Sequence, residues 1–300
     1  MRLDVVGFGA LNIDKLYRVN RIARAGEEIF VKGLTVSPGG SAANTVVGLA
    51  RLSARTGYLG KLADDPEGKY LLDDLRREEV DVSGISLSSN GRSGVCIGFI
   101  DDNGERALYI DPGVNDNLTF SELQPSYAQS SKFLHLTSFV GNVPFNAQKH
   151  LLRSSAGSYV CLDPGELYAR KGLEALRPLL KKTTVFLPNE KEMTMLTKKD
   201  YRNGSKTLLG MGVEVVAVKL GGKGCYVTDG KENYSIPAFA KKPKDTTGAG
   251  DAFCAGFIYG LLNQRDLYTC GKLGNLVASR CIREYGARAG LPSKSDLPKI

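Results

Sequence analysis

The sequence has 300 residues, of which 42% are hydrophobic and 24% charged, and it carries a formal net charge of +8. This balance is typical of a folded globular protein and argues against a disordered chain. The whole sequence contains two histidines, so a histidine-rich zinc site or a Ser-His-Asp hydrolase is disfavoured. No apolar run approaches the roughly 20 residues that a membrane helix needs, so we expect no membrane contact.

Short apolar runs alternate with helical stretches along the chain. This alternation predicts an α/β fold with a doubly wound, mostly parallel sheet that is flanked by helices. Nearly continuous apolar runs such as V-V-A-V-K-L fit strands that are buried on both faces. The predicted strands span residues 3–6, 133–136, 159–162, 185–187, 215–220 and 225–228, and the predicted helices span residues 41–52, 67–78, 190–196 and 249–262.

Two segments, 16–36 and 94–111, contain strand-like runs that no helix follows. In the second, Asn103-Gly104 is a signal for a tight hairpin turn. We therefore expect one domain, residues 1–300, with a small β-sheet lid inserted as these two segments. A lid can close over a substrate and exclude water. Its exposed edge strands favour pairing with a second chain, so we also expect a homodimer through the lid strands.

The start of the chain and its cysteines indicate a reducing, cytoplasmic location. The N-terminal stretch has an acid at Asp4 and lacks the small-residue cleavage site of a secretory signal. The six cysteines form no C-x-x-C pair, so neither a zinc site nor a disulfide framework is predicted. We expect them to be reduced core residues, because free cysteine packs as a small hydrophobic side chain.

The string D-T-T-G-A-G-D-A-F at residues 245–253 is the most informative motif. A glycine-rich turn that leads into a helix exposes backbone N–H groups at the positive end of the helix dipole, and this suits a phosphate. A carboxylate inside such a turn would compete with the phosphate for the same donors. Asp251 is better explained as a general base that takes a proton from an attacking hydroxyl while the amides hold the transferred phosphoryl group.

This string resembles the C-terminal signature of the ribokinase family, the PfkB-type carbohydrate kinases. The N-terminal signature is similar too, as P-G-G-S-A-A-N at residues 38–44. Further similar motifs are N-x-D at 12–14, D-P-G at 163–165, N-x-x-E at 189–192 and L-G-G-x-G at 220–224. The resemblance extends in family order from about residue 5 to 292. It implies a ribokinase-like fold and ATP-dependent phosphorylation of a hydroxyl on a small sugar-like molecule.

The resemblance also implies roles for single residues. Asp251 would be the catalytic base, and the backbone amides of Gly248, Ala249 and Gly250 would form the anion hole. A site that binds hydroxyl groups needs carboxylate and amide side chains, which discriminate strongly between substrates. The residues expected to line this substrate pocket are Asn12, Asp14, Gly39, Gly40 and Asn44.

The nucleotide and metal sites are implied in the same way. Glu192 would help to place Mg²⁺ through water, since Mg²⁺ favours oxygen ligands and keeps several waters. Asp245 and Thr247 resemble residues that bind a monovalent cation such as K⁺ in some relatives. The residues expected along the ATP are Asn189, Lys219, Gly221, Gly222, Gly224 and Asn275.

The sequence does not single out the molecule that accepts the phosphoryl group. Ser41 stands where ribose-preferring relatives carry lysine, and residues 137–145 contain no acid where several sugar kinases have a glutamate. The motifs are compatible with fructokinase-like, nucleoside, inositol or phosphosugar kinases, and a nucleoside kinase is the main alternative. The net charge also admits a nucleic-acid-binding protein, but no aromatic-basic motif supports it. A dinucleotide-dependent oxidoreductase would need a third glycine where Asn12 stands.

Overall fold

The computed structural model describes residues 2–103, 105–154, 157–239 and 242–298. Gly104 of the predicted hairpin turn lies outside the described residues. The strands are β1 (Leu3–Phe8), β2 (Asn12–Val19), β3 (Val31–Gly39), β4 (Thr56–Ala63), β5 (Ile85–Ser88), β6 (Gly94–Ile100), β7 (Arg106–Asp111), β8 (Ser131–Leu136), β9 (Tyr159–Leu162), β10 (Val185–Phe186), β11 (Val215–Lys219), β12 (Cys225–Thr228) and β13 (Asn233–Ile236). The α-helices are α1 (Ser41–Arg51), α2 (Pro66–Arg77), α3 (Pro125–Gln129), α4 (Asn142–Ser154), α5 (Gly165–Leu180), α6 (Glu190–Thr197), α7 (Tyr201–Leu209), α8 (Ala249–Leu262) and α9 (Leu267–Cys281).

The main sheet has the strand order β13-β12-β11-β10-β9-β8-β1-β4-β5. Its strands are parallel from β5 to β11, and β12 and β13 are antiparallel additions at one edge. Strand order reverses next to β1, where the chain turns from one half of the sheet to the other. Because ligands in open α/β sheets bind outside the carboxyl ends of the strands at such a reversal, this topology places a site above β1.

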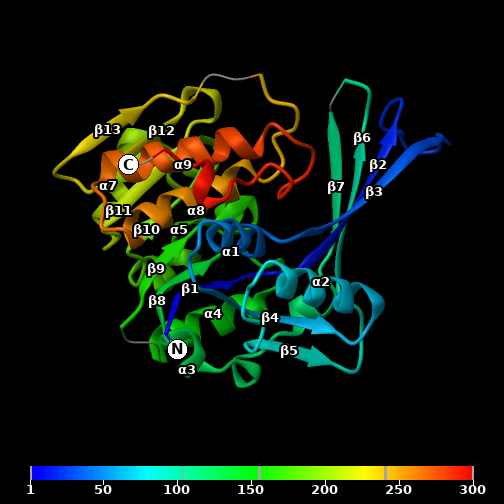
Figure 1. The fold of residues 1–300 in the computed structure, drawn as a ribbon, viewed down its shortest axis with the longest axis horizontal. Coiled ribbons are helices and arrows are strands. Elements are labelled where there is room, and N and C mark those ends of the chain that lie inside the picture. The colour runs from blue at the N-terminus through cyan, green and yellow to red at the C-terminus, as the bar shows by residue number, and fades with distance from the viewer. Residues whose placement is uncertain (1, 104, 155–156, 240–241, 299–300) are drawn as a thin grey trace.

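Helices cover both faces of this sheet (Figure 1). Successive residues of β1 enter opposite cores, because side chains alternate across a strand. Val5 packs in the core beneath α1, α8 and α9, whereas Val6 packs in the core beneath α4, α5 and α6. The expected doubly wound fold is therefore confirmed. None of the helices in the described part of the chain is long and apolar enough to cross a membrane.

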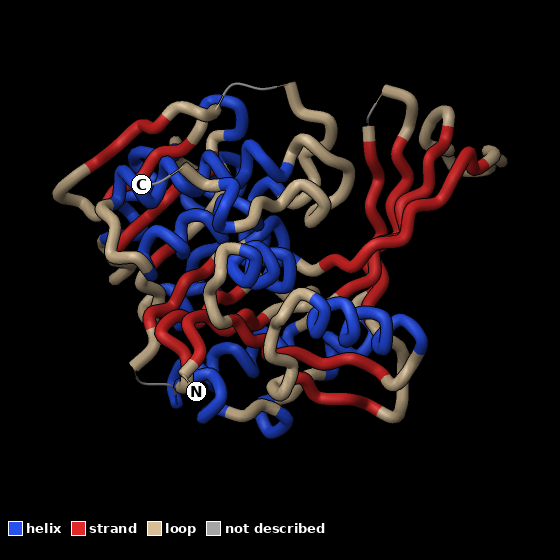
Figure 2. Tube along the Cα trace, in the orientation of Figure 1, coloured by secondary structure: helices blue, strands red, loops and turns tan. Residues whose placement is uncertain are grey.

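A second sheet, with the order β3-β2-β6-β7, projects from the main body as an extended ribbon (Figure 2). The predicted segment 94–111 coincides with β6 and β7. The other segment was predicted too short, because β2 begins at Asn12 and β3 ends at Gly39. Asn12, Asp14 and Gly39 therefore belong to this small sheet, and any movement of the sheet carries them with it.

Candidate active site

The motif at residues 245–253 forms a loop that ends at the N-terminus of α8. Gly248 adopts a left-handed conformation with φ +75°, and a Cβ there would lie 2.6 Å from the Cα of Ala287. Only glycine fits this position without strain. The turn places Asp251 in the first turn of α8, where backbone N–H groups have no partners within the helix. One of the three predicted anion-hole amides, Ala249 N–H, donates to Thr246 O at 3.2 Å in this conformation.

Asp251 lies close to the first residues of α1. The Asn44 side chain donates from Nδ2 to Asp251 Oδ2 at 2.8 Å, which brings together two residues 207 positions apart in the sequence. Burial raises the pKa of Asp251 to about 7, although hydrogen bonds from Asn44 and Ser41 and the charge of Lys219 act in the opposite direction. A carboxylate with a pKa near neutral is suited to accept a proton at physiological pH.

A cavity of about 490 Å³ opens beside the N-terminus of α8. It brings together all of the residues that the resemblance assigned to the nucleotide, which come from the N-cap of α6, the end of β11, the loop after it and the middle of α9. Such a space, with the glycines of residues 221–224 at its wall, can admit a nucleotide whose phosphates face the helix terminus. The predicted residues that line it are Asn189, Glu192, Lys219, Gly221, Gly222, Gly224, Ala249, Gly250, Asp251 and Asn275.

Asn189 and Glu192 form a reciprocal capping box at the start of α6. Glu192 N–H donates to Asn189 Oδ1 and Asn189 N–H donates to Glu192 Oε2, each at 2.8 Å. Burial raises the pKa of Glu192 to about 7, opposed by the charge of Lys219 and reinforced by that of Asp163. The described residues hold no group of three or more His, Cys, Asp or Glu that could chelate a metal. The carboxylates of Glu192 and Asp163 fit an ion such as Mg²⁺ that keeps waters and binds phosphate.

A smaller pocket of about 120 Å³ lies next to the nucleotide cavity, and Ser41 lines both. It is lined by Asn12 and Gly40 from the predicted substrate set. The other predicted substrate residues, Asp14, Gly39 and Asn44, are outside its lining. Asp14 and Gly39 are neighbours of each other, since a Cβ on Gly39 would lie 2.4 Å from Asp14 Oδ1. Burial raises the pKa of Asp14 to about 6, partly offset by the charge of Arg288.

Sequence reasoning missed two residues of this pocket, Asn115 and Asp116. Asn115 is fully buried; its Oδ1 accepts from Leu11 N–H at 3.0 Å and its Nδ2 donates to Leu11 O at 2.8 Å. It therefore holds the backbone that presents Asn12. Asp116 accepts from Gly141 N–H at 2.8 Å and supplies a carboxylate that segment 137–145 lacks. Neither residue belongs to a motif, so the sequence contained no signal for them.

Asn275 and Asp245 also use their polar side-chain atoms within the protein. Asn275 donates from Nδ2 to Ile236 O at 3.1 Å and to Pro237 O at 3.2 Å, so it holds the end of β13 at the cavity wall. Asp245 accepts from Thr247 N–H at 2.9 Å and from Gly286 N–H at 2.8 Å, which ties the loop before α8 to the segment after α9. The monovalent-cation site at Asp245 and Thr247 remains a prediction.

Comparisons with known proteins agree with this architecture. The model of the pfkB family carbohydrate kinases matches residues 2–294. A relative from Archaeoglobus fulgidus, described as an uncharacterized sugar kinase, is 44% identical over 83% of this chain and 100% of its own length. The ATP-dependent ribose-1-phosphate kinase of Halopiger xanaduensis is 30% identical over 95% of this chain and 94% of its own. The ribokinase structure from Thermotoga maritima has a TM-score of 0.88 at 24% identity, covering 98% of this chain and 97% of that one.

The fold is therefore the ribokinase fold. The chain belongs to the pfkB family of carbohydrate kinases. It is an ATP-dependent carbohydrate kinase, and a small-molecule sugar is its acceptor.

Proposed function

We propose that this kinase phosphorylates a hydroxyl group of a neutral sugar and that Asp251 is the general base. The observation that carries the proposal is the position of Asp251 at the start of α8, in the wall of the nucleotide cavity and bonded to Asn44. Ser41, which lines both cavities, lies three residues before Asn44. A sugar hydroxyl in the small pocket and a γ-phosphate in the large one would meet at this point.

In the proposed reaction, the sugar O–H bond breaks and its proton passes to the carboxylate of Asp251. The sugar oxygen forms a bond to the γ-phosphorus as the bond between that phosphorus and the ADP oxygen breaks. The amides at the start of α8 stabilise the charge on the transferred group, and Lys219 lies beside them. The proton on Asp251 then leaves to water after the products dissociate.

Mg²⁺ would be held by Glu192 with water and the ATP phosphates, and when bound it would neutralise charge on the phosphates. The buried acidic pair of Glu192 and Asp163 supports this, because an acid whose pKa is raised by burial is stabilised as the carboxylate by a nearby cation. Asn189 keeps the Glu192 carboxylate oriented through the capping box.

The lining of the small pocket favours a neutral acceptor. It carries the carboxylate of Asp116 and the amide of Asn12, and the described residues that line it include no Lys or Arg. A carboxylate accepts hydrogen bonds from hydroxyl groups but repels a phosphate. A sugar phosphate is the second candidate, because the Halopiger relative that covers 95% of this chain acts on ribose 1-phosphate.

The test is Mg·ATP-dependent ADP release with a panel of neutral sugars, polyols, nucleosides and sugar phosphates, including ribose and ribose 1-phosphate. We expect turnover with a neutral sugar. Turnover confined to sugar phosphates would replace the neutral acceptor by the second candidate. Turnover confined to nucleosides would contradict both.

The role of Asp251 is tested with Asp251→Asn, which keeps the size of the side chain and removes the base. We expect kcat to fall by roughly 10²–10⁴-fold with the ATP dissociation constant nearly unchanged. Asp266→Asn is the matched control, since Asp266 caps α9 through Thr269 N–H at 2.7 Å and asparagine caps equally well. Retention of more than about a tenth of the wild-type kcat by Asp251→Asn would refute the assignment.

A further inference from the structure

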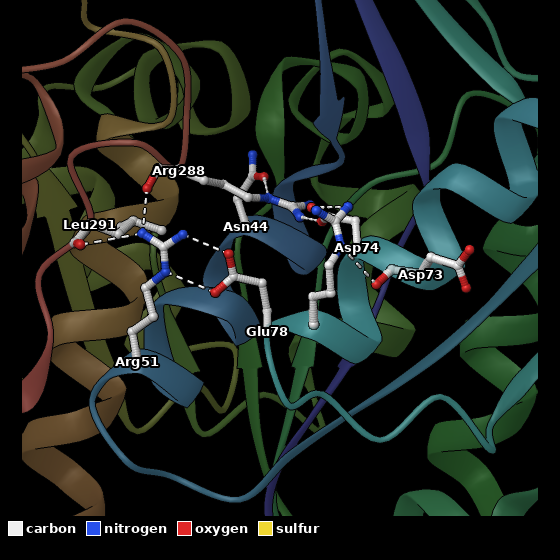
Figure 3. Close-up of polar contacts among 8 residues, drawn as sticks. Asn44, Arg51, Asp73, Asp74, Glu78, Arg288 and Leu291 are labelled. Atoms are coloured by element: carbon white, nitrogen blue, oxygen red, sulfur yellow. Dashed lines mark hydrogen bonds and ion pairs between the residues drawn. The ribbon is translucent and has the colours of Figure 1, made fainter.

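Arg288 lies in the segment after α9, outside every motif discussed so far, and its side chain is buried in the middle of the polar network in Figure 3. Its Nε donates to Asn44 Oδ1 at 2.8 Å, and its Nη1 forms an ion pair with Asp74 Oδ2 of α2. Asp74 is thus the anchor that keeps the guanidinium in place. The residue is 7% exposed, so it is not a surface arginine that happens to lie near the site.

The chemistry of its neighbours allows only one orientation of the Asn44 amide. A guanidinium donates hydrogen bonds and accepts none, so the amide group facing Arg288 must be the oxygen. An ionised carboxylate only accepts, so the amide group facing Asp251 must be the nitrogen. Rotating the amide by 180° would place two donors against each other and two acceptors against each other. Arg288 therefore determines which atom Asn44 presents to Asp251.

We propose that Arg288 is a positioning residue for the catalytic base: by holding Asn44 Oδ1 it keeps Asn44 Nδ2 on Asp251 Oδ2 and reserves Asp251 Oδ1 for the substrate proton. The inference rests on the proposed role of Asp251. It names the oxygen that accepts the proton as the sugar O–H bond breaks. With Oδ2 facing an N–H donor, protonation of that oxygen would set two donors against each other, so the proton goes to Oδ1. The Ser41 hydroxyl also bonds to Asp251, but a hydroxyl can turn from donor to acceptor and so tolerates this proton.

The bond from Asn44 also lowers the pKa of Asp251 against the larger effect of burial. Other groups act on these two side chains from each neighbouring element. Asp251 faces Asp163 after β9, Lys219 of β11, Tyr58 of β4, Cys281 of α9 and Cys254 of its own helix. Arg288 faces Asp14 of β2, Tyr58 of β4, Asp74 of α2 and Glu78, the residue that follows α2. None of these groups holds the Asn44 amide in place of Arg288.

If Asn44 is no longer held, its donor no longer favours the ionised form of Asp251, and the pKa of the base rises. Because the base must be ionised to act, kcat/KM for the sugar rises with pH through the pKa of Asp251 in the free enzyme. Loss of Arg288 should therefore move this rise, the acidic limb of the pH profile, to higher pH. A residue that only supported the fold would lower the amount of active enzyme equally at every pH.

The experiment measures kcat/KM for the sugar from pH 5.5 to 9.5 for the wild-type enzyme and for Arg288→Gln. We expect the acidic limb of the variant to lie about one pH unit higher than that of the wild type. At pH values below the pKa of the base in both enzymes, kcat/KM of the variant should be about tenfold lower, and at high pH the difference should be much smaller. The KM for ATP should stay within about twofold. Lys61→Gln is the control, since Lys61 forms a similarly buried ion pair with Glu122, is 10% exposed, and has no bond to Asn44 or Arg288.

Arg288→Gln leaves Asp74 with only the more distant Arg77, at 3.7 Å, so Arg288→Gln/Asp74→Asn is prepared as well, with Asp74→Asn as its control. An acidic limb that is unchanged in both Arg288 variants would overturn the inference, as would an equal shift in Lys61→Gln. A wild-type enzyme without an acidic limb would overturn the role of Asp251 itself and the inference with it. A wild-type acidic limb that both Arg288 variants leave in place refutes the inference and leaves the role of Asp251 standing.

Discussion

Lys219 Nζ lies 2.5 Å from Asp163 Oδ2, in an ion pair whose side chains are 12% and 8% exposed. A Cβ at position 250 would be 3.4 Å from the same nitrogen, so this cation lies directly beside the first turn of α8. Burial lowers the pKa of Lys219, but the carboxylate charges of Asp163 and Glu192 outweigh it and the net shift is upward. The lysine is therefore cationic where the transferred phosphoryl group is expected.

Lys219→Met should lower kcat by roughly 10²–10³-fold, the usual cost of removing one group that stabilises transition-state charge. It should also lower stability by about 3–5 kcal/mol, because Asp163 is left buried and unpaired. Lys61→Met is the control, since Lys61 forms a similar ion pair with Glu122 away from the site and is 10% exposed. Steady-state kinetics and thermal unfolding of both variants separate the two effects. An equal fall of kcat in Lys61→Met would show that the loss reflects stability.

Gly39→Ala should impair sugar binding more than catalysis. A Cβ at position 39 would lie 2.4 Å from Asp14 Oδ1, so the Asp14 carboxylate must move. We expect the KM for the sugar to rise about tenfold, the cost of one displaced hydrogen bond to a charged group, with the KM for ATP unchanged. Gly33→Ala on the same strand is the control, because its Cβ would meet Arg18 Nε at an ordinary 3.6 Å. A sugar KM within about twofold of wild type would show that Asp14 is not a substrate contact.

Glu192→Gln separates the capping role of Glu192 from its proposed metal role. Glutamine at this position still forms a capping box, so α6 should remain intact and thermal stability should change little. Loss of the carboxylate charge should raise the Mg²⁺ concentration needed for half-maximal activity by about tenfold. A Mg²⁺ titration of ADP release at saturating ATP measures it. Unchanged Mg²⁺ dependence with full activity would limit Glu192 to its role in the helix cap.

The edges of the small sheet should pair with a second copy of the chain. β3 and β7 form these edges and carry exposed apolar residues, among them Leu34, Leu108 and Tyr109 at 51%, 48% and 63% exposure. Unpaired apolar edges favour association with another chain. We expect a dimer in sedimentation experiments and a monomer for Leu108→Glu. Leu87→Glu on β5, exposed by 58% outside this sheet, should remain dimeric. A wild-type monomer at micromolar concentration would refute the prediction.

The parts of the fold that the sequence revealed are those with unbroken apolar runs. β9, β12 and α8 begin and end where predicted. β4 was missed although all eight of its residues are buried, because Gly57, Gly60 and Lys61 interrupt its apolar pattern. Lys61 can be buried there only because Glu122 pairs with it across 61 positions of sequence. No local pattern contains that information.

Helix α9 was not given bounds for a related reason. Its glycines lower helix propensity, yet they permit close packing against α8. A Cβ on Gly274 would lie 2.7 Å from the ring of Phe253, and a Cβ on Gly256 of α8 would lie 2.5 Å from Leu273 O. The glycines therefore reflect the contact between two helices and not a break in either one.

The position of a candidate site residue was predictable where one motif supplies both the side chain and its surroundings, as with Asp251 after Gly248 and Gly250. It was not predictable where the partner is distant. Arg288 meets Asn44 across 244 residues, and Asn115 meets Leu11 across 104. A single arginine or asparagine in the sequence carries no signal of such a contact.

The distance in sequence between Arg288 and Asn44 has a consequence for how the enzyme matures. Closing a chain segment of this length has a large entropic cost, and contacts of such separation slow the approach to the native state. Asn44 precedes most of the main sheet in the chain, whereas Arg288 follows all of it. A chain released before residue 288 could form much of the sheet and still lack an oriented base. Recovery of activity during refolding should therefore lag behind recovery of secondary structure and should mark the joining of the two ends of the chain.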